Sequence, residues 1–160
     1  MQKISNSENG FQAFTTNPRK GHIFLAEYGE NPTIKCYSED LKLLSELKGT
    51  INFFKIKSGV CQLEIKDMDY KPEQDLLILQ CGLPEMSLVL VDWGNKEVLQ
   101  TNSDLSLGSD FVKLKFNPLK QNQILILKKN SLQKLELERR DFLVKQDDYD
   151  KVSFFLDLTI

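Results

Sequence analysis

The sequence is poor in the residues on which most enzyme and metal sites depend. It has a single histidine, His22, and an odd set of three cysteines, Cys36, Cys61 and Cys81, which lie far apart and form no Cys-x-x-Cys pair. One histidine excludes a multi-histidine metal site within the chain, and the cysteine spacing argues against a zinc cage and a disulfide framework. We therefore expect reduced, mostly buried thiols. His22 is expected to open a strand at the edge of a turn rather than to act as a base.

Motifs for bound cofactors are also absent. The glycines fall singly, with no Gly-x-Gly-x-x-Gly or Walker pattern that could cradle a phosphate. Asp147–Asp150 resembles a fragment of a calcium loop, but the glycine and the distal glutamate of an EF-hand loop are missing. An exposed acidic turn is expected there. These absences predict a non-catalytic protein with no catalytic residue, no metal site and no cofactor.

Long apolar runs and a charge of one sign are lacking too. No run approaches the roughly 20 apolar residues that span a bilayer, and the polar start, Met1–Asn9, has no apolar region of a secretory signal. With 41% hydrophobic and 28% charged residues, the 160-residue chain is expected to be a soluble protein of the cytoplasm. A net charge of −2 with interleaved Lys and Glu offers no broad basic face for nucleic acid or membranes. Partners are therefore expected to be other proteins.

Internal repetition is the main positive signal. Three segments each contain a strand-like run that ends near a proline, followed by two further apolar runs. The three prolines are Pro18, Pro72 and Pro118. The last large residue of the third run follows its proline by a similar distance in each repeat. Tyr37 lies 19 residues after the first proline, Trp93 lies 21 after the second and Leu137 lies 19 after the third. The prolines are 54 and 46 residues apart, which brackets the period of roughly 40 to 50 residues expected of β-propeller blades.

Each repeat is predicted to form four antiparallel strands. The first run alternates, as in Phe111, Lys113 and Lys115 against Val112, Leu114 and Phe116, which places one kind of residue on each face of a strand. Proline then ends the run because it has no N–H to extend the ladder, and an Asn-Pro pair favours a turn. The second run is continuously apolar, which favours a strand covered on both faces by stacked sheets. These second runs are Ile23–Ala26, Leu76–Leu79 and Ile124–Leu127. The sequence thus predicts an all-β fold of about three four-stranded WD-like β-propeller blades, a partial propeller. The blades span residues 10–146, after a polar segment at 1–9 and before a terminal strand or docking segment at 147–160.

Four segments receive individual predictions. Phe142–Val144 is predicted to be the last strand of the third repeat, and Ile51–Lys57 an extra strand. Ser38–Gly49 is predicted to contain a strand because the repeat places one there, although its leucine spacing and terminal glycine would also suit a short helix. Val152–Leu158 fits either the first strand of a fourth blade or a docking segment.

Four apolar side chains are predicted to lie in the interior. Tyr37 and Trp93 occupy equivalent repeat positions and are expected to pack between blades rather than to stack on a ligand. Leu77 and Leu125 lie in the second runs, so an aspartate at either position is expected to unfold the chain.

Seven short features occur in a consistent order between residues 10 and 140. They are Ala13–Pro18, Glu27, Asn31–Ile34, Leu47–Thr50, Leu83–Glu85, Val91–Trp93 and Phe116–Leu119. In this order they resemble the WD-repeat region of the cilia- and flagella-associated proteins. The resemblance implies a scaffold of the ciliary or flagellar axoneme that serves motility, with tethering of dynein to doublet microtubules as its implied role. A general cytoplasmic WD-like adaptor unrelated to cilia is the alternative. A propeller hydrolase is a third reading, and it would need clustered His, Asp or Glu near strand starts.

An array of about three blades is incomplete. Propellers close with about 4 to 8 blades, so an open array has two end faces that would be apolar. We expect these faces to meet the blades of another chain or a continuation of this one. The expected partners are axonemal subunits with propeller blades, and dynein and doublet microtubule proteins.

Overall fold

The computed structural model describes residues 10–28, 33–48, 64–82, 87–102, 110–137 and 154–157, and these form strands and turns without a helix. The first sheet contains β1 (Phe11–Asn17), β2 (His22–Glu27), β3 (Thr33–Tyr37) and β4 (Leu43–Lys48). The second contains β5 (Ile65–Lys71), β6 (Leu76–Cys81), β7 (Ser87–Asp92) and β8 (Glu97–Asn102). The third contains β9 (Phe111–Phe116), β10 (Gln123–Lys128), β11 (Leu132–Leu137) and β12 (Phe154–Asp157). Within each sheet, every strand pairs antiparallel with the next, which confirms the predicted all-β class and its four-stranded antiparallel sheets. The described residues accordingly include no helix that could cross a membrane.

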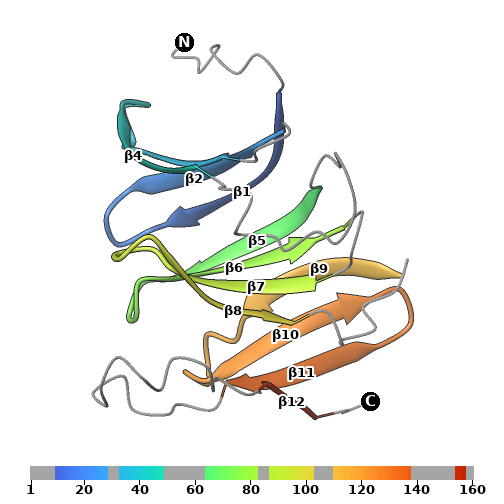
Figure 1. Cartoon of the computed structure of the whole chain (residues 1–160). Coiled ribbons are helices and arrows are strands. Elements are labelled where there is room, and N and C mark those ends of the chain that lie inside the picture. The colour runs from blue at the N-terminus through green and yellow to red at the C-terminus, as the bar shows by residue number, and fades with distance from the viewer. Residues whose placement is uncertain are drawn as a thin grey trace.

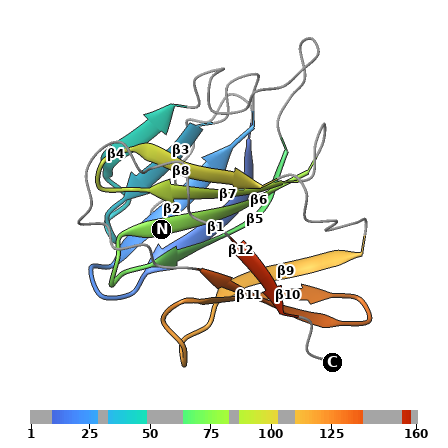
Figure 2. The same cartoon turned by 60° about the horizontal axis from the view of Figure 1, so that its bottom comes forward.

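The three sheets stack face to face, with the second sheet in the middle (Figure 1). Strand β1 contacts β5, and β5 contacts β9, so the first strands of the three sheets lie next to one another (Figure 2). The fourth strands, β4, β8 and β12, form the opposite edges of their sheets. The first and third sheets are therefore the two ends of the stack, and each has one face that no described sheet covers.

Two of the predicted Asn-Pro turns form as expected. The side-chain oxygen of Asn17 accepts a hydrogen bond from the Arg19 amide at 3.1 Å, and that of Asn117 accepts one from the Leu119 amide at 3.0 Å. Such bonds from Asn to the backbone two residues on stabilise turns, and the intervening proline cannot extend a ladder because it has no N–H. In the first turn Gly21 has a φ of +64°, a conformation that glycine adopts without the steric cost of a side chain.

Two apolar clusters fill the spaces between the sheets. Between the first and second sheets, the Phe24 ring stacks on Tyr70 with centroids 4.6 Å apart and meets the edge of Trp93 at 5.1 Å. Between the second and third sheets lie ten buried side chains: Leu76, Ile78, Leu88, Leu90, Leu114, Phe116, Ile124, Ile126, Leu135 and Leu137. Full burial of one Leu, Ile or Phe side chain contributes about 1.5–3 kcal/mol. The clusters therefore bind the first and third sheets to opposite faces of the second.

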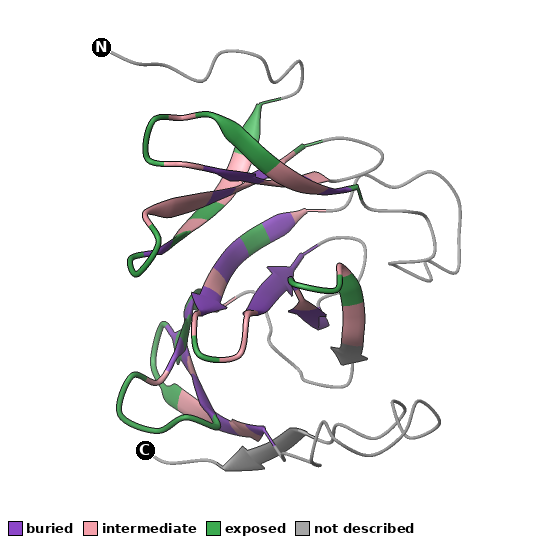
Figure 3. Ribbon diagram, turned by 90° about the vertical axis from the view of Figure 1, so that its left-hand side faces the viewer, coloured by how far each residue is buried: buried purple, intermediate pink, exposed green. Residues whose placement is uncertain are grey.

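Buried residues are most frequent in the middle sheet (Figure 3). Every residue of β6 is buried, whereas β2 and β10 include half-buried or exposed positions on one face. The prediction of strands covered on both faces is thus confirmed for Leu76–Leu79 and wrong for the other two runs. Among the sheets of the described residues, only the second has a neighbour on each side. Leu125 is consequently half-buried, so its predicted place in the interior is wrong, while Leu77 is fully buried.

The predicted alternation in the first run of the third repeat holds for Lys113 to Phe116 and is wrong for Phe111 and Val112. Leu114 and Phe116 are buried, but Val112 is 51% exposed. The pairing of β9 with β10 shifts between Lys113 and Phe111, which leaves Val112 as an extra residue. Such a bulge turns the neighbouring residue to the other face, and Phe111 packs against the second cluster instead.

Outcomes for the individually predicted segments vary. Leu43–Lys48 forms β4, which confirms the strand within Ser38–Gly49 over the short helix. The 152–158 segment contains β12, which pairs with β11 and so completes the third sheet rather than opening a fourth. The position beside β11 was predicted for 142–144, and β12 occupies it instead. The segments 1–9, 51–57 and 142–144 lie outside the described residues.

The pairing register corrects the equivalence of Tyr37 and Trp93. Tyr37 pairs with Ile23 of β2, and Leu77 stands at the same position in β6 of the second sheet. Leu77 pairs with Val91, so the residue equivalent to Tyr37 is Val91, two positions before Trp93. Trp93 packs in the first cluster as predicted. Tyr37 is buried as well, but its row lies on the face of the first sheet directed away from the second, so the prediction that it packs between sheets is wrong.

Candidate functional site

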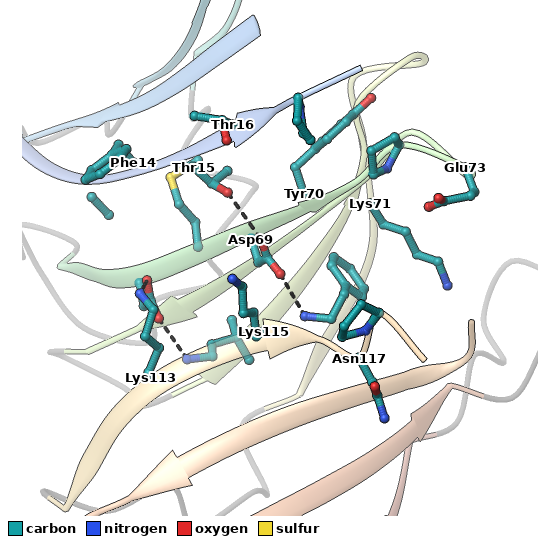
Figure 4. Close-up of a pocket in the computed structure, with 18 of the residues that line it drawn as sticks. Phe14, Thr15, Thr16, Asp69, Tyr70, Lys71, Glu73, Lys113, Lys115 and Asn117 are labelled. Carbon is teal, nitrogen blue, oxygen red and sulfur yellow. Dashed lines mark hydrogen bonds and ion pairs between the residues drawn. The ribbon is translucent and has the colours of Figure 1, made fainter. Parts of the chain in front are cut away.

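A groove runs along the first strands of the three sheets (Figure 4). Its volume is about 760 Å³. It is lined by residues 12–16, 18 and 19 of the first sheet, 66–73 of the second, and 113–118 and 121 of the third. Because β1, β5 and β9 all contribute, side chains from all three repeats meet there.

Asp69 of β5 joins the three strands. One carboxylate oxygen accepts a hydrogen bond from the Thr15 hydroxyl of β1 at 3.2 Å, and the other accepts one from the Phe116 amide of β9 at 2.7 Å. Burial raises the pKa of Asp69, while hydrogen bonds from the Phe116 and Tyr70 amides and from Thr15 oppose that rise. Hydrogen bonds to charged groups are the stronger kind, worth about 1.5–3 kcal/mol each. This single side chain therefore ties the inner edges of all three sheets together.

Asp67 and Gln12 make similar links. Asp67 is buried, accepts the Leu114 amide at 2.7 Å and lies 3.6 Å from the Lys113 ammonium. The Gln12 side chain accepts the Ile65 amide at 2.7 Å and donates to the Glu27 carbonyl at 2.9 Å. Side chains thus satisfy amides at strand edges that no neighbouring strand pairs.

The groove is more basic than acidic. Five cationic side chains line it against three carboxylates. Asp67 and Asp69 already accept backbone amides, and Glu73 pairs with Arg19 where the first turns of two sheets meet. Lys113 and Lys115 remain exposed on β9 (Figure 4). The exposed charge of the groove is therefore mainly the positive charge of lysine side chains.

This arrangement suits binding by hydrogen bonds and charge. The described residues that line the groove include neither histidine nor cysteine, and no group of three or more His, Cys, Asp or Glu suited to a metal ion occurs among the described residues. His22 opens β2, as predicted, opposite Asn17. The acidic turn predicted at 147–150 lies outside the described residues.

Two of the three cysteines can be placed. Cys36 and Cys81 are buried free thiols, as expected, and Cys61 lies outside the described residues. Burial raises the pKa of Cys81 to about 12 and also raises that of Cys36. A thiol with so high a pKa is protonated at neutral pH and a poor nucleophile. Both residues therefore act as small apolar side chains.

The uncovered faces at the ends of the stack carry apolar side chains. On the first sheet Phe14 is 68% exposed and Leu43 is 51% exposed, beside a Glu27–Lys35 ion pair of 2.9 Å that raises the pKa of Lys35. On the third sheet, Leu127 is 44% exposed and Leu132 is 37% exposed. Exposed apolar side chains grouped on one face are typical of surfaces that bind another protein.

Asp67 and Asp69 were missed by sequence reasoning. The signal was present, because two carboxylates alternate with Met68 and Tyr70 on a strand whose neighbours are apolar. A buried carboxylate needs partners, but the sequence did not reveal that these would be the amides of a strand 47 residues away.

No protein-family model matches the chain, and no curated protein matches it either. Its function must therefore be argued from the sheets, the groove and the uncovered faces.

Proposed function

We propose that the chain is a non-catalytic scaffold in the ciliary or flagellar axoneme, built as a partial WD-like β-propeller whose end faces bind other proteins. Two features support the propeller reading. Each sheet is a four-stranded meander, and the first strands of successive sheets adjoin one another around a shared groove, as the inner strands of propeller blades do.

The observation that carries the proposal is the pair of uncovered end faces. Phe14 and Leu25 of the first sheet align with Met68 and Leu79 of the second, which are buried in the first cluster. On the third sheet, Leu125 aligns with Ile78, which is buried in the second cluster. The end sheets therefore carry apolar residues at positions that are covered wherever a neighbouring sheet exists. A protein that keeps such faces is built to have them covered by a partner.

Placement in the axoneme follows from the resemblance of the motifs to the cilia- and flagella-associated proteins. Tethering of dynein to doublet microtubules is the role we propose within that setting. A general cytoplasmic adaptor is the second candidate, because uncovered faces suit any assembly and do not require a cilium.

Fractionation separates these two candidates. The tagged full chain should remain with axonemes after detergent removes the membrane, and high salt should release it together with its partners. Recovery only in the detergent-soluble fraction would favour the adaptor. A screen against esters, peptides and glycosides tests the non-catalytic part, and turnover of any of them would contradict it.

A matched pair of variants connects this location to the end face. Phe14→Asp places a charge on the uncovered face of the first sheet, and Leu119→Asp places one in the β9–β10 turn, where Leu119 is 89% exposed. Both side chains are largely in solvent, so both variants should fold normally. Phe14→Asp should lose retention in the axoneme and Leu119→Asp should keep it. Equal retention of the two would count against the face as a binding surface.

A further inference from the structure

The pairing register shows which residues are equivalent on the successive sheets. One row of paired residues crosses each sheet on the face directed toward the next sheet in the chain, which we call the forward face. The rows are Thr15, Phe24 and Cys36 in the first sheet, Asp69, Ile78 and Leu90 in the second, and Lys115, Leu125 and Lys134 in the third. An adjacent row reads Ala13, Ala26 and Ile34, then Asp67, Gln80 and Leu88, then Lys113, Leu127 and Leu132.

The forward faces of the first and second sheets are buried against the next sheet. Where the second sheet meets the third, Asp67 and Asp69 accept the amides of Leu114 and Phe116, each at 2.7 Å. These carboxylates hold the inner strand of the following sheet in place. The contact pairs acceptors on the forward face with N–H donors on the sheet that docks there.

The third sheet reverses this chemistry. Lys113 and Lys115 stand at the positions of Asp67 and Asp69, and Lys134 at that of Leu90. A lysine ammonium has three donors and no acceptor. Lys113 already lies 3.6 Å from Asp67, but its side chain is 61% exposed, so it keeps donors in solvent, as does the exposed Lys115. A sheet that docks on this forward face must therefore supply acceptors, whereas the third sheet supplied donors to the second.

A second copy of the chain meets that requirement poorly. The carboxylates of its first sheet, Glu27 and Glu46, already pair with Lys35 at 2.9 Å and Lys48 at 3.2 Å. If its first sheet docked as the third sheet docks on the second, its Phe14 and Thr16 would take the places of Leu114 and Phe116. Backbone N–H groups at those places would face Lys113 and Lys115, so donors would meet donors. Groups of like polarity placed opposite each other cost free energy and discriminate against a partner.

We propose that the forward face of the third sheet docks a β-sheet of a different protein that presents Asp or Glu carboxylates opposite Lys113 and Lys115. Aliphatic side chains of that sheet cover Leu125, Leu127 and Leu132. The inference rests on the proposed scaffold function and names the partner's chemistry. The chain is then one part of a mixed ring, and its lysines prevent it from closing on itself.

Zero-length crosslinking with a carbodiimide tests this directly, because the reagent joins an ammonium to a carboxylate only when the two are in contact. Treatment of the native assembly that holds the full chain should link Lys115 to an Asp or Glu of another protein, while Lys113 can also link to Asp67 of its own chain, 3.6 Å away. Links from these lysines to Glu27 or Glu46 of a second copy would overturn the proposal. So would a purified chain that forms discrete dimers at micromolar concentration and dissociates when Leu127 is replaced by Asp.

Variants supply the second arm. Lys115→Glu should weaken retention of the crosslinked partner by about tenfold or more, since loss of a close charge pair commonly costs that much. Lys120 is an exposed lysine in the β9–β10 turn. Lys120→Glu is therefore the matched control and should not change retention of the partner. Because Lys115 lies near Asp69, Leu127→Asp provides a variant on the same face that leaves the inner strand unchanged. Retention of the partner by both Lys115→Glu and Leu127→Asp would refute the docking surface.

The two proposals can fail separately. A chain that is absent from axonemes but crosslinks through Lys115 to a carboxylate of a cytoplasmic protein would remove the proposed location and keep this inference. A chain retained in axonemes by Phe14, whose Lys115→Glu variant keeps every partner, would do the opposite.

Discussion

Leu77 and Leu125 both lie in the continuously apolar second runs of their repeats, yet the fold places them in different surroundings. Leu77 is fully buried in the cluster between the first and second sheets, whereas Leu125 is half-buried on the uncovered face of the third. Leu77→Asp should therefore unfold the isolated chain, and Leu125→Asp should leave it folded.

The expected magnitudes differ accordingly. Removing most of a buried leucine costs about 2–5 kcal/mol, because transfer free energy is lost and a cavity remains. Burial of an unpaired carboxylate adds several kcal/mol more. A total stability of about 5–15 kcal/mol leaves little after that loss. At Leu125 the carboxylate can be solvated, and the neighbouring Lys115 and Lys134 in its row favour the negative charge, so a change within about 1 kcal/mol is expected.

Urea unfolding followed by circular dichroism measures both effects. Leu77→Asp should show no cooperative transition, and Leu125→Asp should keep a transition midpoint close to that of the unaltered chain. A stable Leu77→Asp variant would show that the first two sheets do not stack as described. An unfolded Leu125→Asp variant would show that the third sheet is covered within the single chain, and the proposed docking face would then have to be abandoned.

Three further experiments test the interior. Asp69→Ala should lower the free energy of unfolding by about 2–4 kcal/mol, because the Phe116 amide and the Thr15 hydroxyl lose the carboxylate that accepts their hydrogen bonds. Asp40→Ala in an exposed turn is the control and should change the free energy of unfolding little. Equal urea midpoints for the two variants would refute the bridging role of Asp69. Because burial raises the pKa of Asp69 above its usual 3.8, its ionisation disfavours the folded state, so the unaltered chain should lose stability relative to Asp69→Asn as the pH rises from 3.8 through the raised pKa. A gain in the stability of the unaltered chain relative to Asp69→Asn over that range would contradict the sign. Cys81, with its pKa raised to about 12 by burial, should resist iodoacetamide in the folded chain and react in urea, as peptide mapping would show; rapid alkylation without urea would contradict its burial.

Local patterns predicted the strands well because strand formation here depends on neighbouring residues. The alternation in Lys113–Phe116 and the turn at Asn117 are properties of a few consecutive residues, and both appear as predicted. The edge beside β11 was mispredicted for a different reason. Phe142–Val144 and Phe154–Asp157 are both short apolar runs, and only pairing with β11 across a long connection selects the second.

The candidate site was predictable in part. The absence of a histidine cluster in the sequence favours protein binding over catalysis as a hypothesis. The hydrogen bonds that join the strands of the groove, however, link residues far apart in sequence. Asp69 and Phe116 are 47 positions apart, and Gln12 and Ile65 are 53 apart. No local period reports such partners, so a carboxylate that bridges three strands looks in the sequence like an ordinary polar residue on a strand's solvent face.

The prediction of strands covered on both faces is wrong for the two end sheets, and this error bears on the proposed function. Whether a strand is covered on both faces depends on how many sheets stack beside it, and the residues of the strand do not encode that number. Ile23, Leu25 and Leu125 nevertheless keep aliphatic side chains on faces that no described sheet covers. Had those faces evolved to meet water, charged residues would be the expected occupants, since an exposed apolar sheet face promotes aggregation. The second runs of the end sheets therefore have the composition of strands that lie between two sheets. The coverage that the sequence predicts would then be completed by the sheets of other proteins.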